Sequence, residues 1–344
     1  MDDIFENMFM TSDKIVDLLS NKLISQLEVI NNVKFEESEI NNGVASRIKH
    51  TNVKGFDIYY EDDAHVYYII KDGVRLPLIS VTTLIGLFNI PFDTYNQAIR
   101  CANKTEYDCN CLDITNWDYI TIDERTKRIL KAWDENNRIA TEYGTAVHMA
   151  CEYLANNINM DFDEILDIVV SRCGDVLKDR KLVYKYLVKF KKFLQYYLDQ
   201  GFEIITEPVV VDLILGSAGQ SDLILIHHEK KIIKTLDHKT NAENPVEEKA
   251  YNKMRGIFSH LDSYAYTHYC IQIPYYSFML KQIYKDYTVD EMTLLWFNEE
   301  DEGYKLIPID MDYWNKQIQN MREYFIKHNI SKRVYDKIKE YNEN

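Results

Sequence analysis

Charged residues in the second half of the chain have the types and spacing of a metal-dependent hydrolase site. Asp237, His238 and Lys239 form an Asp-x-Lys triplet at the end of an apolar run, and Asp222 precedes them in the segment that begins at Gly219. Alternate residues of a strand share a face, so Asp237 and Lys239 would project together, with His238 on the opposite side. A hard cation such as Mg²⁺ prefers oxygen ligands. The aspartate could therefore anchor a metal ion while the ammonium positions or deprotonates a water, or neutralises phosphate charge.

The strands expected around these residues bring the two aspartates together. Residues 209–215 and 223–226 have the apolar composition of strands, and the Gly-Ser-Ala-Gly segment at 216–219 suits a turn between them. Asp222 would then lie on a strand beside the one that carries Asp237. Two carboxylates that meet across strands repel each other unless a cation lies between them. A surface hairpin with scattered charges is the alternative.

Two pairs at helical spacing add to this set. His148 and Glu152 lie one turn apart in a predicted helix and share a face, so the histidine could complete a metal site. Gln272 and Tyr276 have the same spacing and would share a face if their segment is helical, although Pro274 lies between them and would kink or begin a helix. The alternatives are a hydrogen-bonded core histidine and an ordinary amphipathic helix.

In order along the chain, these residues resemble the motifs of the PD-(D/E)XK nuclease superfamily, in the RecB-type branch that includes phage exonucleases. That branch has the pattern G-x-x-x-H, then E…G-x-x-D, then D/E-x-K, then Q-x-x-x-Y. The matching residues are Gly144…His148, Glu207…Gly219…Asp222, Asp237-His-Lys239 and Gln272…Tyr276. The match covers about residues 141–280.

The resemblance implies an α/β fold with a restriction-endonuclease-like core, in which helices flank a mixed central sheet, and an N-terminal helical and β-hairpin region. It also implies a role for each matching residue. His148, Asp222 and Asp237 would be ligands of Mg²⁺ or Mn²⁺, with the carbonyl of His238 as a further ligand. Asp222, Asp237 and Lys239 would carry catalysis. Gln272 and Tyr276 would help to hold the nucleic-acid strand, and Glu152 and Glu207 would have supporting roles.

Four segments are expected. An N-terminal helix and a polar linker occupy 1–52, and a β-hairpin and helical region that could form a gate occupies 53–140. The nuclease core covers 141–310, and helices at 311–344 close the chain. The expected activity is hydrolysis of DNA, most simply by an exonuclease of viral or phage replication, recombination or repair. The expected partners are a single strand or duplex end and a recombination or replication protein. A catalytically silent relative, an endonuclease and a hydrolase of small phosphorylated substrates are the alternatives.

Composition limits these functions. The net charge of −15 opposes nucleic-acid binding unless metal ions and a local basic groove neutralise phosphates, and lysines at 181, 185, 189 and 192 could line such a groove. Six cysteines without a disulfide framework predict a reducing compartment, the cytoplasm of the cell or of an infected host. The acidic start argues against a secretory signal, and no apolar run is long enough to span a membrane.

Overall fold

The computed structural model describes residues 10–32, 48–62, 64–71, 74–174, 180–241, 244–248, 250, 252–297 and 304–343. These residues divide into two compact units. The first comprises 1–90, 152–158 and 188–344, and the second comprises 91–151 and 159–187, apart from the residues outside the description. Most of the polar linker expected at 33–52 lies outside the described residues.

The first unit contains two sheets. The six-stranded sheet has the order β1 (Ile48–Val53), β2 (Phe56–Glu61), β3 (Val66–Lys71), β4 (Val74–Ser80), β7 (Ser217–Gln220) and β6 (Val209–Asp212). Its neighbours are antiparallel except β4 and β7, which are parallel through Ile79 and Ser217. The sheet curls, because β1 and β2 also lie beside β6. This pairing makes the N-terminal strands part of the same sheet as a hairpin from the middle of the chain.

The five-stranded sheet has the order β11 (Tyr304–Pro308), β10 (Thr288–Phe297), β9 (Ile232–Lys239), β8 (Leu223–His227) and β5 (Glu203–Thr206). Only β9 and β10 are parallel, and the other neighbours are antiparallel. The sheet is therefore mixed. Strand β8 is buried along its whole length, as its run of Leu and Ile predicts. The mixed α/β fold expected from the sequence is confirmed.

A bent ribbon of chain joins the two sheets. Strands β5 and β8 pair in the five-stranded sheet, and their continuations β6 and β7 pair in the six-stranded sheet. The chain crosses between the sheets at Glu207 on the outward path and at Asp222 on the return. The backbone N–H of Glu207 donates to the carbonyl of Asp222 at 3.1 Å, which fastens the two crossings together.

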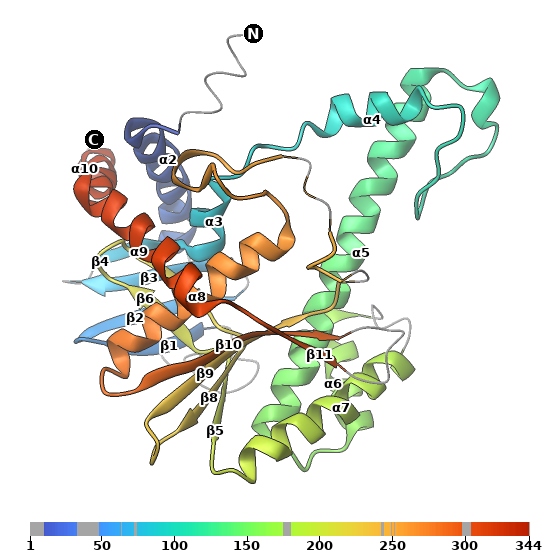
Figure 1. Ribbon diagram of the computed structural model, residues 1–344. Coiled ribbons are helices and arrows are strands. Elements are labelled where there is room, and N and C mark those ends of the chain that lie inside the picture. Colours follow the sequence, from blue (N-terminus) through green and yellow to red (C-terminus); the bar gives the residue numbers. More distant parts are fainter. Residues whose placement is uncertain are drawn as a thin grey trace. The chain divides into compact units, whose positions relative to one another are not determined.

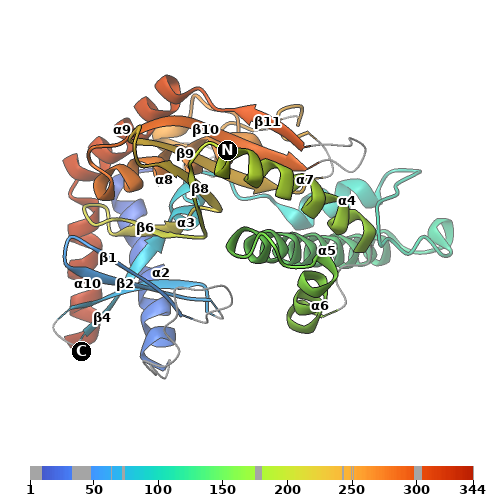
Figure 2. The ribbon, with the colours of Figure 1, turned by 90° about the horizontal axis from the view of Figure 1, so that it is seen from below.

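The helices of the first unit cover these sheets. They are α2 (Ser12–Asn32), α3 (Val81–Gly86), a 3₁₀ turn η3 (Gly256–Phe258), α8 (Ala265–Ile283), α9 (Met311–Lys327) and α10 (Ile330–Glu343). Helix α8 is buried around most of its circumference and packs against β9 and β10 of one sheet and β6 of the other. Helices α2 and α10 lie side by side (Figures 1 and 2). The largest core cluster joins all these helices to both sheets.

The second unit is helical in its described part. It contains α4 (Thr94–Ala102), a 3₁₀ turn η2 (Trp117–Tyr119), most of α5 (Ile122–Asn156), α6 (Phe162–Cys173) and the start of α7 (Arg180–Leu198). A small core of Ala98, Ala102, Trp117 and Ile129 holds α4 against the first turns of α5. Helix α5 continues without a break through residues 139–141, because nothing in the segment stops a helix.

The prediction of a turn at 216–219 is wrong. The chain turns at 213–216, where the Asp212 carboxylate accepts the backbone N–H groups of Ile214 and Leu215, and Gly216 takes a φ of +66°. Residues 217–220 are strand β7. Their small side chains allow α8 to approach closely, since a Cβ on Gly219 would lie 2.5 Å from the Tyr276 ring. Among the described residues, no helix is both long and apolar enough to cross a membrane.

Candidate metal and catalytic site

Asp237 and Lys239 lie side by side on β9, as their alternation predicts. Both point to the same face and form an ion pair, and the carboxylate is buried. The Lys239 ammonium also lies 4.6 Å from the centre of the Tyr269 ring, where a cation is stabilised. The His238 side chain points to the other face of the strand and packs edge-on against Phe190. The triplet therefore presents a carboxylate and an ammonium together to one side of the sheet.

Asp222 lies directly opposite this pair. It precedes β8, whose first residue Leu223 pairs with Leu236 of β9. The backbone N–H of His238 donates to Asp222 Oδ2 at 2.7 Å, which fixes the carboxylate next to the strand that carries Asp237. Because the acceptor is an ionisable carboxylate, this hydrogen bond is charge-assisted when Asp222 is ionised, and such a bond holds the carboxylate in one orientation.

Glu207 occupies the other crossing between the sheets. Its φ of +47° lies in the left-handed region, which costs a residue with a side chain about 1 kcal/mol. The fold maintains this conformation because the Glu207 N–H bonds to the Asp222 carbonyl and the Gln220 side chain donates to the Glu207 carbonyl. Strained backbone held by the surrounding structure is frequent at functional sites. Both crossings thus carry a carboxylate.

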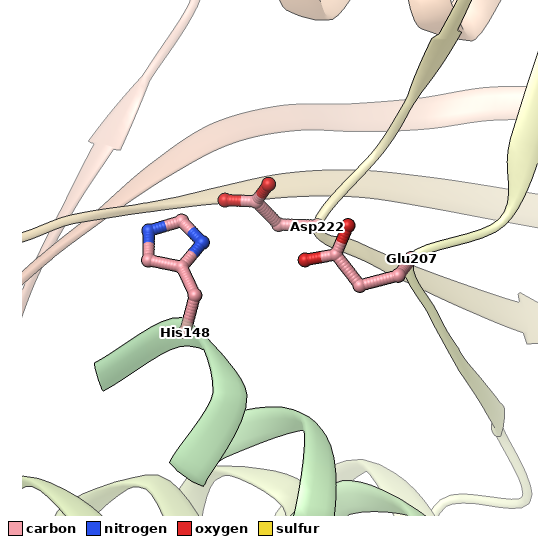
Figure 3. Close-up of side chains that lie close together, drawn as sticks. All are labelled: His148, Glu207 and Asp222. Atoms are coloured by element: carbon pink, nitrogen blue, oxygen red, sulfur yellow. The ribbon is translucent and has the colours of Figure 1, made fainter. Parts of the chain in front are cut away.

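His148 and Glu152 stand one turn apart on α5, the helix that runs without a break from the second unit into the first. Within the first unit, one carboxylate oxygen of Glu207 lies within 4.8 Å of one of Asp222 (Figure 3). Two carboxylates are donors that Mn²⁺ and Mg²⁺ accept. The residues therefore fit a divalent cation.

The electrostatics of the cluster favour a bound cation. Burial raises the pKa of Glu207 well above its usual value, and the neighbouring Asp222 raises it further. Burial likewise raises the pKa of Asp222, although Lys239 and the His238 N–H oppose the shift. Burial disfavours the ammonium of Lys239, but Asp237 and Asp222 outweigh this and raise its pKa. Lys239 is consequently a charged ammonium at neutral pH, and a divalent cation beside Glu207 and Asp222 would favour the ionised forms of both carboxylates.

Lys49 is a residue of this site that the sequence motifs do not include. It lies on β1, and its ammonium is 3.2 Å from Glu152 Oε1. The pair borders a pocket of about 190 Å³ whose wall also contains Glu207. Asn156, on the last turn of α5, donates to the Thr206 hydroxyl at 2.8 Å and closes the same pocket. No local pattern marks Lys49, because its partner is 103 residues away.

Gln272 and Tyr276 share a face of α8, which runs through Pro274 without ending. The Gln272 amide donates to the Tyr276 hydroxyl at 2.8 Å. The Tyr276 ring is buried against Gly219, and burial raises the pKa of its hydroxyl. Asp237, Asp222 and Glu207 lie near enough to raise this pKa further. Gln272 and Tyr276 therefore lie near the carboxylates of Asp237, Asp222 and Glu207, on the helix that contacts both sheets.

Comparisons with known proteins give limited information. No protein-family model matches the sequence, and no curated protein matches it. Among solved structures, the chain is similar to the crystal structure of a "Putative exonuclease" from Eubacterium rectale. The similarity covers 58% of this chain and 68% of that one, with 13% identity and a TM-score of 0.36. The functional assignment accordingly depends on the residues of the site.

Proposed function

We propose that the protein is a metal-dependent nuclease of the PD-(D/E)XK superfamily that hydrolyses DNA, and that it acts as an exonuclease. The observation that carries this proposal is the meeting of three carboxylates and a lysine at the junction of two sheets. Asp222 and Glu207 occupy the crossings, and Asp237 and Lys239 project from the adjacent strand. The motif order of the RecB-type branch supports the same assignment.

In this proposal, His148, Asp222 and Asp237 hold Mg²⁺ or Mn²⁺, with the carbonyl of His238 as a further ligand. The metal would supply Lewis acidity at a phosphate oxygen and a lower pKa for the attacking water. Glu207 belongs with the ligands, because its carboxylate lies beside that of Asp222. The oxygen of a water would attack phosphorus in line while its proton passes to solvent water, and the bond to the 3′ or 5′ oxygen would break as that oxygen takes up a proton from solvent.

Lys239 acts as a cation in this mechanism. Its raised pKa means that it carries a proton at neutral pH, so it orients the attacking water and stabilises negative charge on the phosphate. Asp237 fixes the ammonium through their ion pair. Gln272 and Tyr276 support the strand-binding surface from α8, and exposed lysines on α7, at 181, 185 and 192, offer phosphate contacts.

A cleavage assay on end-labelled linear and closed circular DNA, single- and double-stranded, tests the proposal with Mg²⁺ and with Mn²⁺. An exonuclease digests linear DNA and leaves circles intact, and Asp237→Ala and Lys239→Ala abolish the activity. Nicked or linearised circles would identify an endonuclease instead. Absence of cleavage with either metal would favour a silent nucleic-acid- or protein-binding relative, or a hydrolase of small phosphorylated substrates.

The biological setting follows from the same proposal. A DNA exonuclease of this branch serves replication, recombination or repair, and phage proteins are prominent among its members. A recombination or replication protein of a phage or its host is the proposed partner. Co-purification of such a protein with the wild-type chain, and its loss on truncation, would test this part separately.

A further inference from the structure

The second unit contains a pocket of about 600 Å³ that the proposed nuclease chemistry does not use. It is formed by the α4–α5 connection, residues 103–121, which has no regular structure except the 3₁₀ turn η2. Its wall includes Tyr107, Ile114, Trp117 and Tyr119. A connection of this length without a helix or strand of its own usually has a function in a compact protein.

Side chains of α5 hold the α4–α5 connection in place. Arg125 donates to the carbonyl of Trp117 at 2.8 Å, and Arg128 donates to two further carbonyls of the connection. Farther along the helix, the indole N–H of Trp133 donates to the hydroxyl of Tyr107 at 3.0 Å. These bonds shape the pocket before a ligand arrives, and a preformed pocket loses less conformational entropy on binding.

The pocket is acidic. Residues 103–121 contain four carboxylates and one lysine. Asp113 and Asp118 each have an arginine within 4.0 Å. Glu106 and Asp108 lie exposed in the pocket wall and form no ion pair within the described part of the unit. Unpaired negative charge repels phosphate groups and attracts cations, so the pocket suits a basic ligand and not a nucleic acid.

The same pocket exposes large apolar and aromatic side chains. Tyr119 is 90% exposed, more than any other large hydrophobic side chain among the described residues, and Ile114 is 55% exposed. Exposed apolar patches with a polar rim mark protein–protein contact sites, and aromatic faces attract ammonium and guanidinium groups. In addition, the buried Nε1–H of Trp117 has no hydrogen-bond partner in the described part of the chain. A backbone carbonyl of a bound peptide is the kind of acceptor that this donor lacks.

We propose that the pocket of the α4–α5 connection binds a segment of a partner protein in which arginine or lysine side chains alternate with apolar ones. Glu106 and Asp108 pair with the basic side chains, and the exposed rim of Tyr119 and Ile114 packs against the apolar ones. The proposal goes beyond the proposed nuclease activity and does not depend on it, because it uses no residue of the metal and catalytic site.

Fluorescence anisotropy tests the proposal with a short fluorescein-labelled peptide of alternating arginine and leucine, in metal-free buffer with about 0.15 M salt. The wild-type protein is expected to bind this peptide saturably. The double variant Glu106→Gln/Asp108→Asn removes the two unpaired charges and should weaken binding about tenfold. Tyr119→Ser removes an exposed ring, so it should also weaken binding while the Tm stays at the wild-type value.

The double variant Asp163→Asn/Glu164→Gln is the matched control, since it removes the same charge from the exposed first turn of α6 in the same unit. It should bind the peptide as tightly as the wild type does. Circular dichroism and a cooperative thermal transition establish that each variant is folded. Equal weakening in the two double variants would indicate general attraction to an acidic protein and would overturn the proposal, as would the absence of saturable binding.

A labelled single-stranded oligonucleotide tests the other class of ligand. The pocket variants should not weaken its binding, because they remove no positive charge. Weaker binding of the oligonucleotide but not of the peptide by Tyr119→Ser would assign this surface to nucleic acid and overturn the proposal. The same variants should cleave DNA at the wild-type rate, so failure of the peptide to bind leaves the proposed nuclease function intact.

Discussion

Each of the two sheets contributes one lysine to the site, each lysine forms an ion pair with a carboxylate, and the two pairs are built in opposite ways. Asp237 and Lys239 are two residues apart on one strand of the five-stranded sheet, so the alternation of a strand is enough to bring them together. Lys49 and Glu152 come from a strand of the six-stranded sheet and from a helix, 103 residues apart. The first pair is encoded locally, and the second exists only because of the topology.

The two lysine–carboxylate pairs therefore depend on different parts of the structure. The local pair needs only one strand, and in the proposed function it lies at the reacting phosphate. The long-range pair depends on the closure of the curled sheet and lines the pocket beside Glu207. Substitutions in the five-stranded sheet should therefore mainly lower the cleavage rate, and substitutions in the six-stranded sheet should mainly lower the stability of the fold.

The largest effect is expected from the five-stranded sheet. Asp237→Asn and Lys239→Ala should each lower the cleavage rate about a thousandfold, because one removes a ligand charge and the other removes the cation at the phosphate. Single-turnover cleavage of end-labelled linear DNA measures the rate. Each variant leaves one charge of this buried pair without its partner and should therefore also lose stability, so circular dichroism must first show that the variant is folded. A loss of only severalfold in either variant would mean that the local pair is not the reacting pair.

In the six-stranded sheet, the next largest effect is expected on the free energy of unfolding. Arg322 of α9 donates to the fully buried Asp212 at the end of β6 at 2.6 Å. Arg322→Ala leaves that buried carboxylate without its counter-charge and should lower the free energy of unfolding by about 3–5 kcal/mol. Urea denaturation measures the change, and Arg322→Lys, which keeps the charge, should lose less. Equal losses in the two variants would show that packing against Phe278, and not the charge, is the main contribution.

A smaller effect is expected where α8 meets the six-stranded sheet. Gly219→Ala would bring a Cβ within 2.5 Å of the Tyr276 ring and should destabilise the protein by about 1–3 kcal/mol. The displaced ring would also disturb the bond to Gln272. Gly86→Ala is the control, because nothing lies within 4 Å of its added Cβ. Tyr276→Leu should relieve the clash in a double variant, and additive losses in a double-mutant cycle would contradict the contact.

The smallest effect is a pH dependence of the metal's contribution to stability. The pKa of Glu207 is raised above its ordinary value of 4.5, so the metal-free folded protein retains a proton that the unfolded chain has lost. Metal-free stability should therefore fall as pH rises from about 4.5 toward the folded pKa. Mn²⁺ binds the ionised form, so the rise in Tm that it causes should grow over the same range, and a concentration of about 100 Kd adds about 2.7 kcal/mol.

Differential scanning fluorimetry with and without Mn²⁺, from about pH 5 to about pH 8, follows this effect. Glu207→Gln should flatten both pH dependences, since the amide does not titrate. A Tm increment that is independent of pH in the wild-type protein would contradict the role of Glu207 as a ligand.

Sequence reasoning succeeds where one element contains the whole pattern. The alternation of Asp237 and Lys239 and the helical spacing of Gln272 and Tyr276 need only the local backbone, and the structure has each pair in contact. For both pairs, the information lies within a few residues. The mixed sheet, in contrast, is implied by the resemblance of the motifs to a known family and not by a local pattern.

The parts that could not be predicted depend on distant segments. Ser217, Ala218 and Gly219 look like a turn, because small residues are frequent in turns, but here they form a strand under α8. Lys49 carries no local signal at all. Its position follows from the parallel pairing of β4 with β7, which joins residues more than a hundred positions apart. The curl of the sheet then depends on how the strands twist together, which no single strand specifies.

The packing of α2 against α10 has a consequence for synthesis of the protein. Arg333 and Asp13, which are 320 residues apart, form an ion pair between these helices, and both helices contribute to the core that holds the two sheets. At about 5–20 residues per second, a ribosome needs roughly 15–60 s to add α10 after α2. The core remains open during that time. The core that holds the two sheets is therefore completed only when α10 has been translated.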